Sequence, residues 1–227
     1  MPNESTTAGD RNFCYDSCMS EKIPQPHLEL LAPASSLLNR LASEVPPEQI
    51  TSPETQWLID EMLSIAKGEQ GSSQKRTLVG LAAPQVGINK RIIIVDLAGT
   101  GMGEVPDLRV YINPVIVSRS TETEIGREGC FSTGNVCGIV DRASAITVKA
   151  LDRNGQAIEE DYTGFSARIF QHETDHLDGV RFPDRIVDDA RLHWVEPDQF
   201  GDYRQQWRDW STRCDRQTWD MIKAGTM

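Results

Sequence analysis

The chain has 227 residues, enough for one good-sized domain with a core that needs no disulfides. Its 34 acidic residues outnumber its 23 lysines and arginines, and no basic cluster stands out, so the net charge of −11 argues against a nucleic-acid partner. No run of 18 apolar residues is present, which argues against a membrane span. The odd number of cysteines, five, predicts reduced thiols in a cytoplasmic protein.

The N-terminal segment is expected to be a flexible arm over residues 1–27, because it is polar and aperiodic. It lacks the apolar stretch of a signal peptide, and its acidic residues are atypical of a transit peptide. Cys14 and Cys18 are interpreted as incidental thiols, since no second Cys/His pair follows nearby. We expect a main domain over 28–190 and a C-terminal helical extension over 191–227.

The first predicted helix runs from about Ser52 to Lys67. Ser52 can cap its first turn, Pro53 suits the first helical position, and acidic residues lie toward the positive end of the helix dipole. Apolar residues repeat along one broad face, so we expect this helix to pack on the core. The apolar segment Leu28–Ala42 before it is expected to dock on the same core.

Beyond this helix the pattern changes to strands. Runs that are β-branched or alternating, and that are bounded by turn residues, predict strands at Arg91–Leu97, Arg109–Ser118, Ala145–Leu151 and Gln156–Tyr162. Pro114 is expected to interrupt the second strand, and the DRNG turn between the last two predicts a hairpin. An exposed loop is expected at 68–76 and a loop rich in glycine and proline at 99–107.

A second helix is predicted from Gly164 to about Leu177, with Gly179 near its end. Residues 198–223 could form a further amphipathic helix, and we expect the tryptophans of this tail to pack onto the domain. The order of elements predicts an α+β fold, with mostly antiparallel strands around a central helix in the C-terminal half of the chain.

The predicted central helix carries two histidines and a glutamate with the spacing of a metal site. His172 and His176 are four residues apart, so both imidazoles lie on one face and suit two ligands of a tetrahedral ion. Glu173 lies about 100° around the helix from His172, where its carboxylate can reach a metal-bound water. Histidines hydrogen-bonded in a core are the alternative, but two of only four fall at ligand spacing around a glutamate. A metal-dependent amide hydrolase is predicted, with Glu173 as general acid/base.

A catalytic site of this kind needs a third protein ligand. The metzincin pattern would place a His where Phe182 stands, and Glu196, the only later glutamate, is followed at once by a proline. Upstream, Cys130 in the segment REGCFS would complete a Cys-His-His site as a thiolate and leave one position open. The GLAAPQ segment adds a candidate donor to an oxyanion, the amide of Gln85.

The three segments GLAAPQ, EGCFS and QHETDH, in this order and at these separations, resemble the peptide deformylase family over roughly residues 28–190. The resemblance implies that this range is a catalytic domain. It implies the following roles: metal ligands Cys130, His172 and His176; catalytic acid/base Glu173; oxyanion donors Gln85 and the backbone N–H of Phe131. It also implies that Glu128 ties its segment to Arg142 or Arg168.

The resemblance further implies the reaction and its setting. The family removes the formyl group from the N-terminal formyl-methionine of new polypeptides and releases formate, with Fe²⁺ as the usual metal and Zn²⁺ or Ni²⁺ able to take its place. The implied partners are nascent peptides at the ribosome of a bacterial-type cytoplasm, while the sequence predicts no oligomeric state. The implied methionine pocket is lined by Val79, Gly80, Phe165, Ile169 and the ring of His172.

The chain departs from the family pattern in several places, three of them near the predicted substrate site. Leu78 stands where a glycine is usual, and we expect it to crowd the backbone near the substrate or change the strand geometry. Gly126 stands where an apolar pocket residue is common, which would enlarge the pocket. The segment 133–138 lacks a usual proline and has Cys137 where an arginine is often found, so the peptide preference beyond methionine is expected to differ.

Two other functions fit the same residues. A hydrolase of another N-acyl amine, or of a peptide with a different first residue, is favoured by Leu78 and Gly126. A non-catalytic metal-binding protein that docks on a partner is favoured by the Trp-rich tail and the N-terminal arm. Against the latter, such a protein would have no physical need of Glu173 and Gln85.

Overall fold

The structure is a computed structural model that describes residues 27–69, 77–99 and 105–226. The predicted arm, with Cys14 and Cys18, lies outside the described residues apart from its last position. Most of the two predicted loops at 68–76 and 99–107 also lies outside them. Among the helices that are described, none combines the length and the apolar character needed to cross a bilayer.

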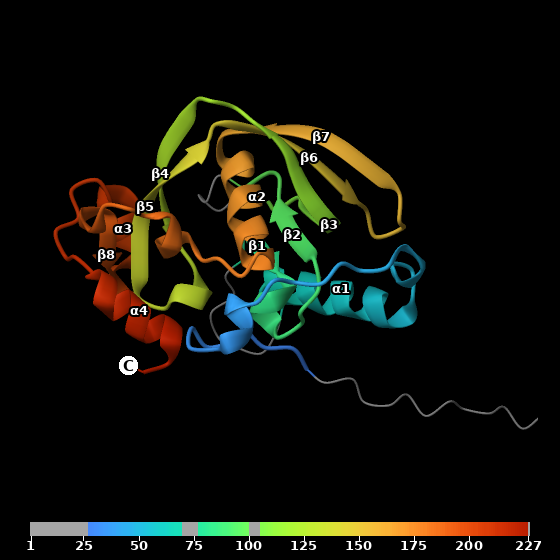
Figure 1. The fold of residues 1–227 in the computed structure, drawn as a ribbon, viewed down its shortest axis with the longest axis horizontal. Helices are drawn as coiled ribbons and strands as arrows, with labels where there is room; N and C mark the ends of the chain where they lie inside the picture. Colours follow the sequence, from blue (N-terminus) through green and yellow to red (C-terminus); the bar gives the residue numbers. More distant parts are fainter. Residues whose placement is uncertain (1–26, 70–76, 100–104, 227) are drawn as a thin grey trace, which may run out of the picture.

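The strands form two antiparallel sheets (Figure 1). The larger sheet has five strands, in the spatial order β1 (Gly80–Ala82), β2 (Ile92–Asp96), β3 (Leu108–Arg119), β6 (Ala145–Leu151) and β7 (Ala157–Thr163). The smaller sheet has three strands, in the order β4 (Thr123–Gly129), β5 (Val136–Ala143) and β8 (Leu192–Trp194). Strands β1 and β4 are therefore each at the edge of their sheet.

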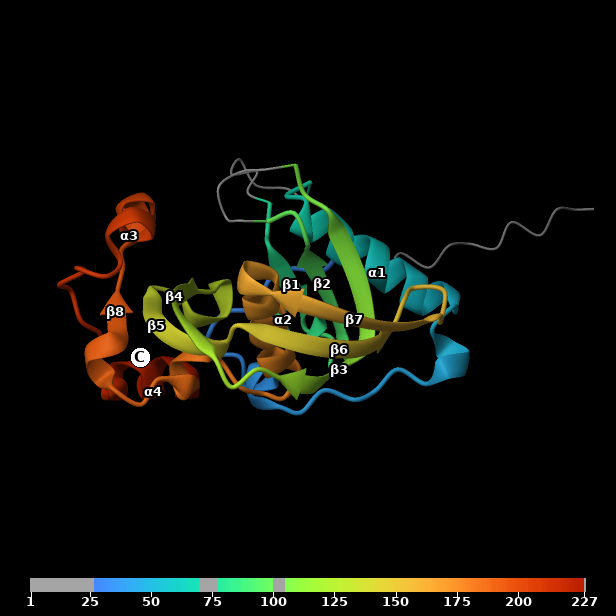
Figure 2. The same ribbon diagram turned by 90° about the horizontal axis from the view of Figure 1, so that it is seen from above.

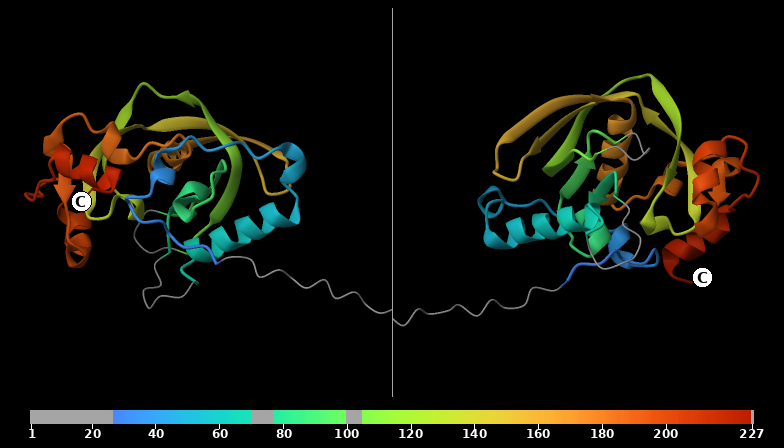
Figure 3. Two further views of the ribbon diagram at one scale, coloured as in Figure 1. Left: turned by 60° about the horizontal axis from the view of Figure 1, so that its bottom comes forward. Right: turned by 180° about the vertical axis from the view of Figure 1, so that it is seen from behind.

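The helices of the described residues are α1 (Pro53–Ala66), α2 (Gly164–Leu177), α3 (Phe200–Gln206) and α4 (Arg216–Ala224). Short 3-10 turns connect them and the strands at Ser36–Asn39, Pro47–Gln49, Ala83–Val86, Phe131–Thr133, Phe182–Arg185, Asp189–Arg191 and Pro197–Gln199. Figure 1 shows α2 beneath the arch of β6 and β7. The two views of Figure 3 show the C-terminal segment with α3 and α4 at the end of the molecule away from α1.

The core lies on both faces of the larger sheet. In β2, Ile93 and Val95 face the cluster that contains Phe170 of α2, while Ile92 and Ile94 face the cluster packed against α1. All five residues of β2 are buried, because a helix covers each face of the sheet at this strand. This packing fixes α2 in the middle of the molecule.

Several predicted elements are confirmed by the structure. Helix α1 begins one residue after Ser52, whose side chain accepts a hydrogen bond from the Thr55 N–H at 3.2 Å. Pro114 interrupts the pairing of the second strand as expected: β3 continues through it, but its register with β6 shifts between Ile112 and Val115, and Asn113 takes a positive φ of 51°. The predicted hairpin is present as β6 and β7, and the α+β fold with antiparallel strands around α2 is confirmed.

The tail differs from the single helix expected over 198–223. Two short helices, α3 and α4, are separated by residues 207–215. Within this break the chain turns back to β8: the Trp194 N–H bonds the Thr212 carbonyl at 3.1 Å, and the Cys214 N–H bonds the Leu192 carbonyl at 3.1 Å. These pairings satisfy backbone groups that a continuous helix would have used internally, so the helix is interrupted.

Candidate active site and metal centre

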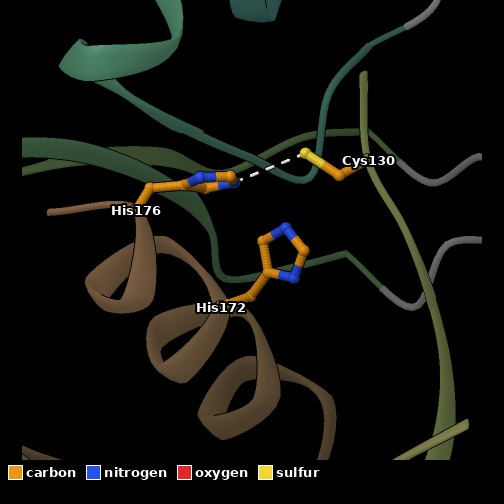
Figure 4. Close-up of side chains that lie close together, drawn as sticks. All are labelled: Cys130, His172 and His176. Carbon is orange, nitrogen blue, oxygen red and sulfur yellow. Dashed lines mark hydrogen bonds between the residues drawn. The ribbon is translucent and has the colours of Figure 1, made fainter. Parts of the chain in front are cut away.

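Helix α2 places its two histidines in one direction. Gly164 begins the helix at a φ of 57°, and Gly179, at a φ of 70°, follows its end. The ring centroids of His172 and His176 are 5.1 Å apart, as expected for side chains one turn apart. Figure 4 shows both rings pointing away from the helix toward Cys130.

Cys130 completes a compact set of donor atoms at the end of β4. Its Sγ lies 3.4 Å from Nε2 of His176, and the ligand atoms of Cys130, His172 and His176 all lie within 4.8 Å of one another. One thiolate and two imidazoles suit a tetrahedral or near-tetrahedral cation that keeps an open position. The donor set therefore fits a divalent transition-metal ion.

Glu128 supports this set from behind. Its carboxylate accepts a hydrogen bond from Nδ1 of His172 at 2.8 Å, which leaves Nε2 of that ring as the free ligand atom. Arg142 donates twice to Glu128 at 2.9 Å, and Arg168 donates once at 2.9 Å, so both arginines anticipated by the resemblance are used. Burial alone would raise the pKa of Glu128, but the bonds and charges of Arg142 and His172 lower it well below its usual range. Asp175 takes the remaining nitrogen of Arg142 at 2.6 Å.

Glu173 is buried beside the donor set without such partners. Its Oε2 has no hydrogen-bond partner among the described residues. Burial raises the pKa of this carboxyl to about 7, with smaller opposing contributions from neighbouring charges. Gly80 packs so closely here that an added Cβ would lie 2.8 Å from Cγ2 of Ile169, which explains a glycine at this position. A carboxyl with a pKa near neutrality is suited to both accept and donate a proton.

Gln85 is held so that its amide nitrogen faces the donor set. Its Oε1 accepts a bond from the Ala82 N–H at 2.7 Å, which fixes the orientation of the amide. Its Nε2 then lies 3.2 Å from Sγ of Cys130 and 3.2 Å from Oγ of Ser132. Phe131, directly after Cys130, is the first residue of a 3-10 turn, so its N–H is not used by the bonds of that turn.

A cavity of about 540 Å³ opens onto these groups. Every residue predicted for the methionine pocket lines it, namely Val79, Gly80, Phe165, Ile169 and His172. Leu78 also lines it and packs on the cluster beside α1. At Gly126 the expectation of a larger pocket is wrong, because an added Cβ would lie 2.7 Å from Cζ of Arg168, whose guanidinium fills that space.

Some lining residues were not anticipated from the sequence. They come from the outer face of β4 and from the C-terminal tail: Arg127, Pro197, Phe200, Tyr203 and Arg204. No local signal marks the four tail residues, since they reach the cavity only through the pairing of β8 with β5.

Comparison with known proteins agrees with this geometry. A family model described as Polypeptide deformylase matches residues 29–191. Peptide deformylase 2 of Pseudomonas putida is 36% identical over 171 residues, which cover 74% of this chain and 92% of that protein. The chloroplastic peptide deformylase 1A of Solanum lycopersicum is 33% identical over 181 residues, 74% of this chain and 63% of that protein. The chain thus spans less than two thirds of this plant relative.

Solved structures give the same result. The class I type b peptide deformylase from Acinetobacter baumannii, bound to Met-Ala-Ser, has a TM-score of 0.62 and 36% identity, over 70% of this chain and 98% of that chain. The peptide deformylase from Thermotoga maritima has a TM-score of 0.60 and 32% identity, over 72% of this chain and all of that chain.

Proposed function

The chain belongs to the peptide deformylase family, and we propose that it removes the formyl group from the N-terminal formyl-methionine of newly made polypeptides and releases formate. One observation carries the proposal. A thiol and two imidazoles lie within 4.8 Å of one another, beside a buried carboxyl whose pKa is about 7 and an oriented amide. These are the groups that a metal-assisted amide hydrolysis requires.

Cys130, His172 and His176 would hold one divalent ion, which we propose to be Fe²⁺, with Zn²⁺ or Ni²⁺ able to use the same ligands. Burial lowers the pKa of His176 well below its usual value, which favours the neutral ring that a ligand must be. A bound divalent ion would supply Lewis acidity and lower the pKa of a coordinated water to about 7.

Glu173 would move the proton of the reaction. It accepts a proton as the water oxygen bonds to the formyl carbon, and it returns the proton to the amine nitrogen as the carbon–nitrogen bond breaks. Its pKa of about 7 allows it to serve in both directions near neutral pH. The products are formate and a free methionine amine.

Gln85 and Phe131 would stabilise the charge that develops on the formyl oxygen. The amide nitrogen of Gln85 already faces Cys130, and the Phe131 N–H is adjacent along the chain. Two fixed donors of this kind stabilise an oxyanion more than they stabilise the neutral carbonyl, which lowers the barrier.

The cavity suits an extended peptide with an apolar first side chain. Val79, Phe165 and Ile169 form the apolar part, where methionine would lie. Gly80 on β1 and Gly129 on β4 both line the cavity at sheet edges, so their strands offer backbone groups to a bound peptide. We propose that 28–190 act as the catalytic domain on nascent peptides, at the ribosome in a bacterial-type cytoplasm.

The proposal is tested by formate release from metal-loaded protein. We expect formyl-Met-Ala-Ser to be turned over, and to be clearly preferred to acetyl-Met-Ala-Ser and formyl-Leu-Ala-Ser. Preference for another acyl group or first residue would indicate a different hydrolase. A metal-loaded protein that turns over none of the three would indicate a binding protein instead.

The role of Glu173 is tested in the same assay. We expect Glu173→Ala to lower kcat by about 10³-fold, within the usual range for a lost general base, with metal content unchanged. The control is Asp178→Ala, at the exposed end of the same helix, which should keep its activity. A Glu173→Ala protein as active as the control would contradict the assigned role.

A further inference from the structure

The C-terminal tail forms one wall of the substrate cavity. Strand β8 extends the smaller sheet beyond β5, and α3 follows it. Figure 2 shows β8 and α3 on one side of β4, with α2 and β1 on the other side. Phe200 and Arg204 of α3 line the same cavity as Glu173, so the tail contributes directly to the surface that a bound peptide would meet.

Side chains beneath α3 hold this wall in place. Tyr203 is 3% exposed, and its hydroxyl lies 3.1 Å from Nδ1 of His193 on β8. Its ring packs edge-to-face on Trp210 at 5.3 Å between centroids, and the Trp210 Nε1 donates to the Trp194 carbonyl at 3.0 Å. Arg213 bonds the other nitrogen of His193. The position of α3 is therefore fixed by buried polar and aromatic contacts.

Two arginines meet on this wall. Nε of Arg127, on the outer face of β4, donates to the backbone carbonyl of Arg204 at 3.2 Å. Within the described part of the chain, neither guanidinium has a carboxylate oxygen within 4.0 Å. Burial and the nearby charge of Arg204 lower the pKa of Arg127, as expected for two cations held close together.

The rest of the cavity does not neutralise this pair. Glu128, one of two acidic residues in the lining, is already bound by Arg142 and Arg168. The other, Glu173, serves the proton transfer proposed above. In a chain of net charge −11, the outer wall of the cavity thus carries a local excess of positive charge.

We infer that Arg127 and Arg204 are specificity-determining residues that bind a carboxylate of the substrate peptide beyond its formyl-methionine. The inference rests on the proposed deformylase function and narrows its substrate class. Arg127 precedes Cys130 by three residues, which corresponds to about 10 Å along a strand. An extended peptide with its formyl group at Cys130 covers that distance by its second or third residue. The carboxylate is therefore an acidic side chain there, or the free C-terminus of a short peptide.

The test compares substrates that differ only in charge. We expect kcat/KM for formyl-Met-Ala-Glu-amide to exceed that for formyl-Met-Ala-Gln-amide by about fivefold, the upper end for an exposed ion pair. The same comparison of formyl-Met-Glu-Ala-amide with formyl-Met-Gln-Ala-amide shows whether an acidic side chain is preferred at the second residue. Formyl-Met-Ala-Ala with a free or an amidated C-terminus separates a side-chain carboxylate from a terminal one. The preference should weaken as salt rises, because the ion pair is screened.

Variants then assign the preference to the two arginines. Arg204→Gln and Arg127→Gln should each reduce the ratio toward one, and Arg204→Glu should favour formyl-Met-Ala-Lys-amide. Arg208→Gln is the matched control, because Arg208 lies on the same tail over Trp207 and outside the cavity lining. A wild-type enzyme that turns over all these peptides equally would overturn the inference and leave the deformylase function intact. A protein that turns over none of them would overturn the proposed function itself.

Discussion

The two faces of strand β4 lie in opposite chemical surroundings. On the inner face, Glu128 is buried and its carboxylate binds two arginines and His172. On the outer face, Arg127 is half-buried beside Arg204, and no carboxylate of the described residues pairs with it. The polar groups of the inner face are paired with one another, so this face can hold the proposed metal ligand His172 rigidly. The outer face has unbalanced charge, and we propose a carboxylate of the substrate as its partner.

The sharpest contrast between the two faces is expected from removing one charge on each. Glu128→Gln should lower the free energy of unfolding by about 3–5 kcal/mol, because Arg142 and Arg168 lose the buried carboxylate charge that they share. It should also weaken metal affinity by about 10–100-fold, since His172 loses its hydrogen-bond acceptor. Arg127→Gln should change stability by less than about 1 kcal/mol. Urea unfolding measures the stability of both variants, and metal titration measures their metal affinity. Equal losses in the two variants would contradict the proposed difference between the two faces of β4.

A second prediction concerns the catalytic rate, kcat, rather than the stability of the protein. Gln85→Leu should lower kcat by about 100-fold, because a donor to the developing oxyanion is lost while the ligands remain. The matched control is Gln56→Leu, whose amide bonds the Ile50 and Arg153 carbonyls far from the site. That variant should lose stability and keep its kcat. A Gln85→Leu enzyme with unchanged kcat would remove Gln85 from the mechanism.

The smallest expected effect is a change of stability with pH, and it comes from His193 beneath α3. Burial, and then the charge of Arg213, lower the pKa of His193 to about 4. Because the unfolded chain binds this proton with a pKa near ~6.5, stability is lost as pH falls from about 6.5 toward 4. The loss from this group at pH 5 is about 2 kcal/mol.

This pH effect is measured as a difference between variants. His193→Gln, which cannot titrate, should lose less stability than the wild type between pH 7.5 and pH 5 in urea unfolding. His27→Gln, which changes an exposed histidine, should follow the wild type. Identical pH dependence in all three proteins would show that the pKa of His193 is the same in the folded and the unfolded state.

The sequence predicted helix α2 and its histidines far better than it predicted β4 and the C-terminal tail. Helix α2 and the proximity of its two histidines follow from local spacing, because His172 and His176 need only a regular helix to face one way. Strand β4 was missed, since its inner face carries Glu128 and Gly126 instead of apolar residues, and Ile125 is its only aliphatic side chain. Because a charged side chain, Glu128, occupies the buried position of β4, its sequence lacks the alternation of apolar and polar residues that indicates a half-buried strand.

The position of the C-terminal tail beside the cavity could not be predicted, for a different reason. The predicted helix over 198–223 has suitable local periodicity, but residues 212–214 pair with β8 and interrupt it. That pairing joins segments about twenty residues apart, and β8 in turn pairs with β5. Only this tertiary arrangement brings Arg204 to the cavity, so no motif around Arg204 could indicate its place.

The central claim is that Cys130, His172 and His176 hold one metal ion at which a formyl peptide is hydrolysed. The most direct test is formate release from formyl-Met-Ala-Ser by anaerobically purified protein, with metal content measured on the same samples. We expect activity to rise in proportion to bound Fe²⁺ up to one ion per chain, and to be lost in Cys130→Ala together with the metal. Protein that carries one ion per chain at these ligands and releases no formate would contradict the claim.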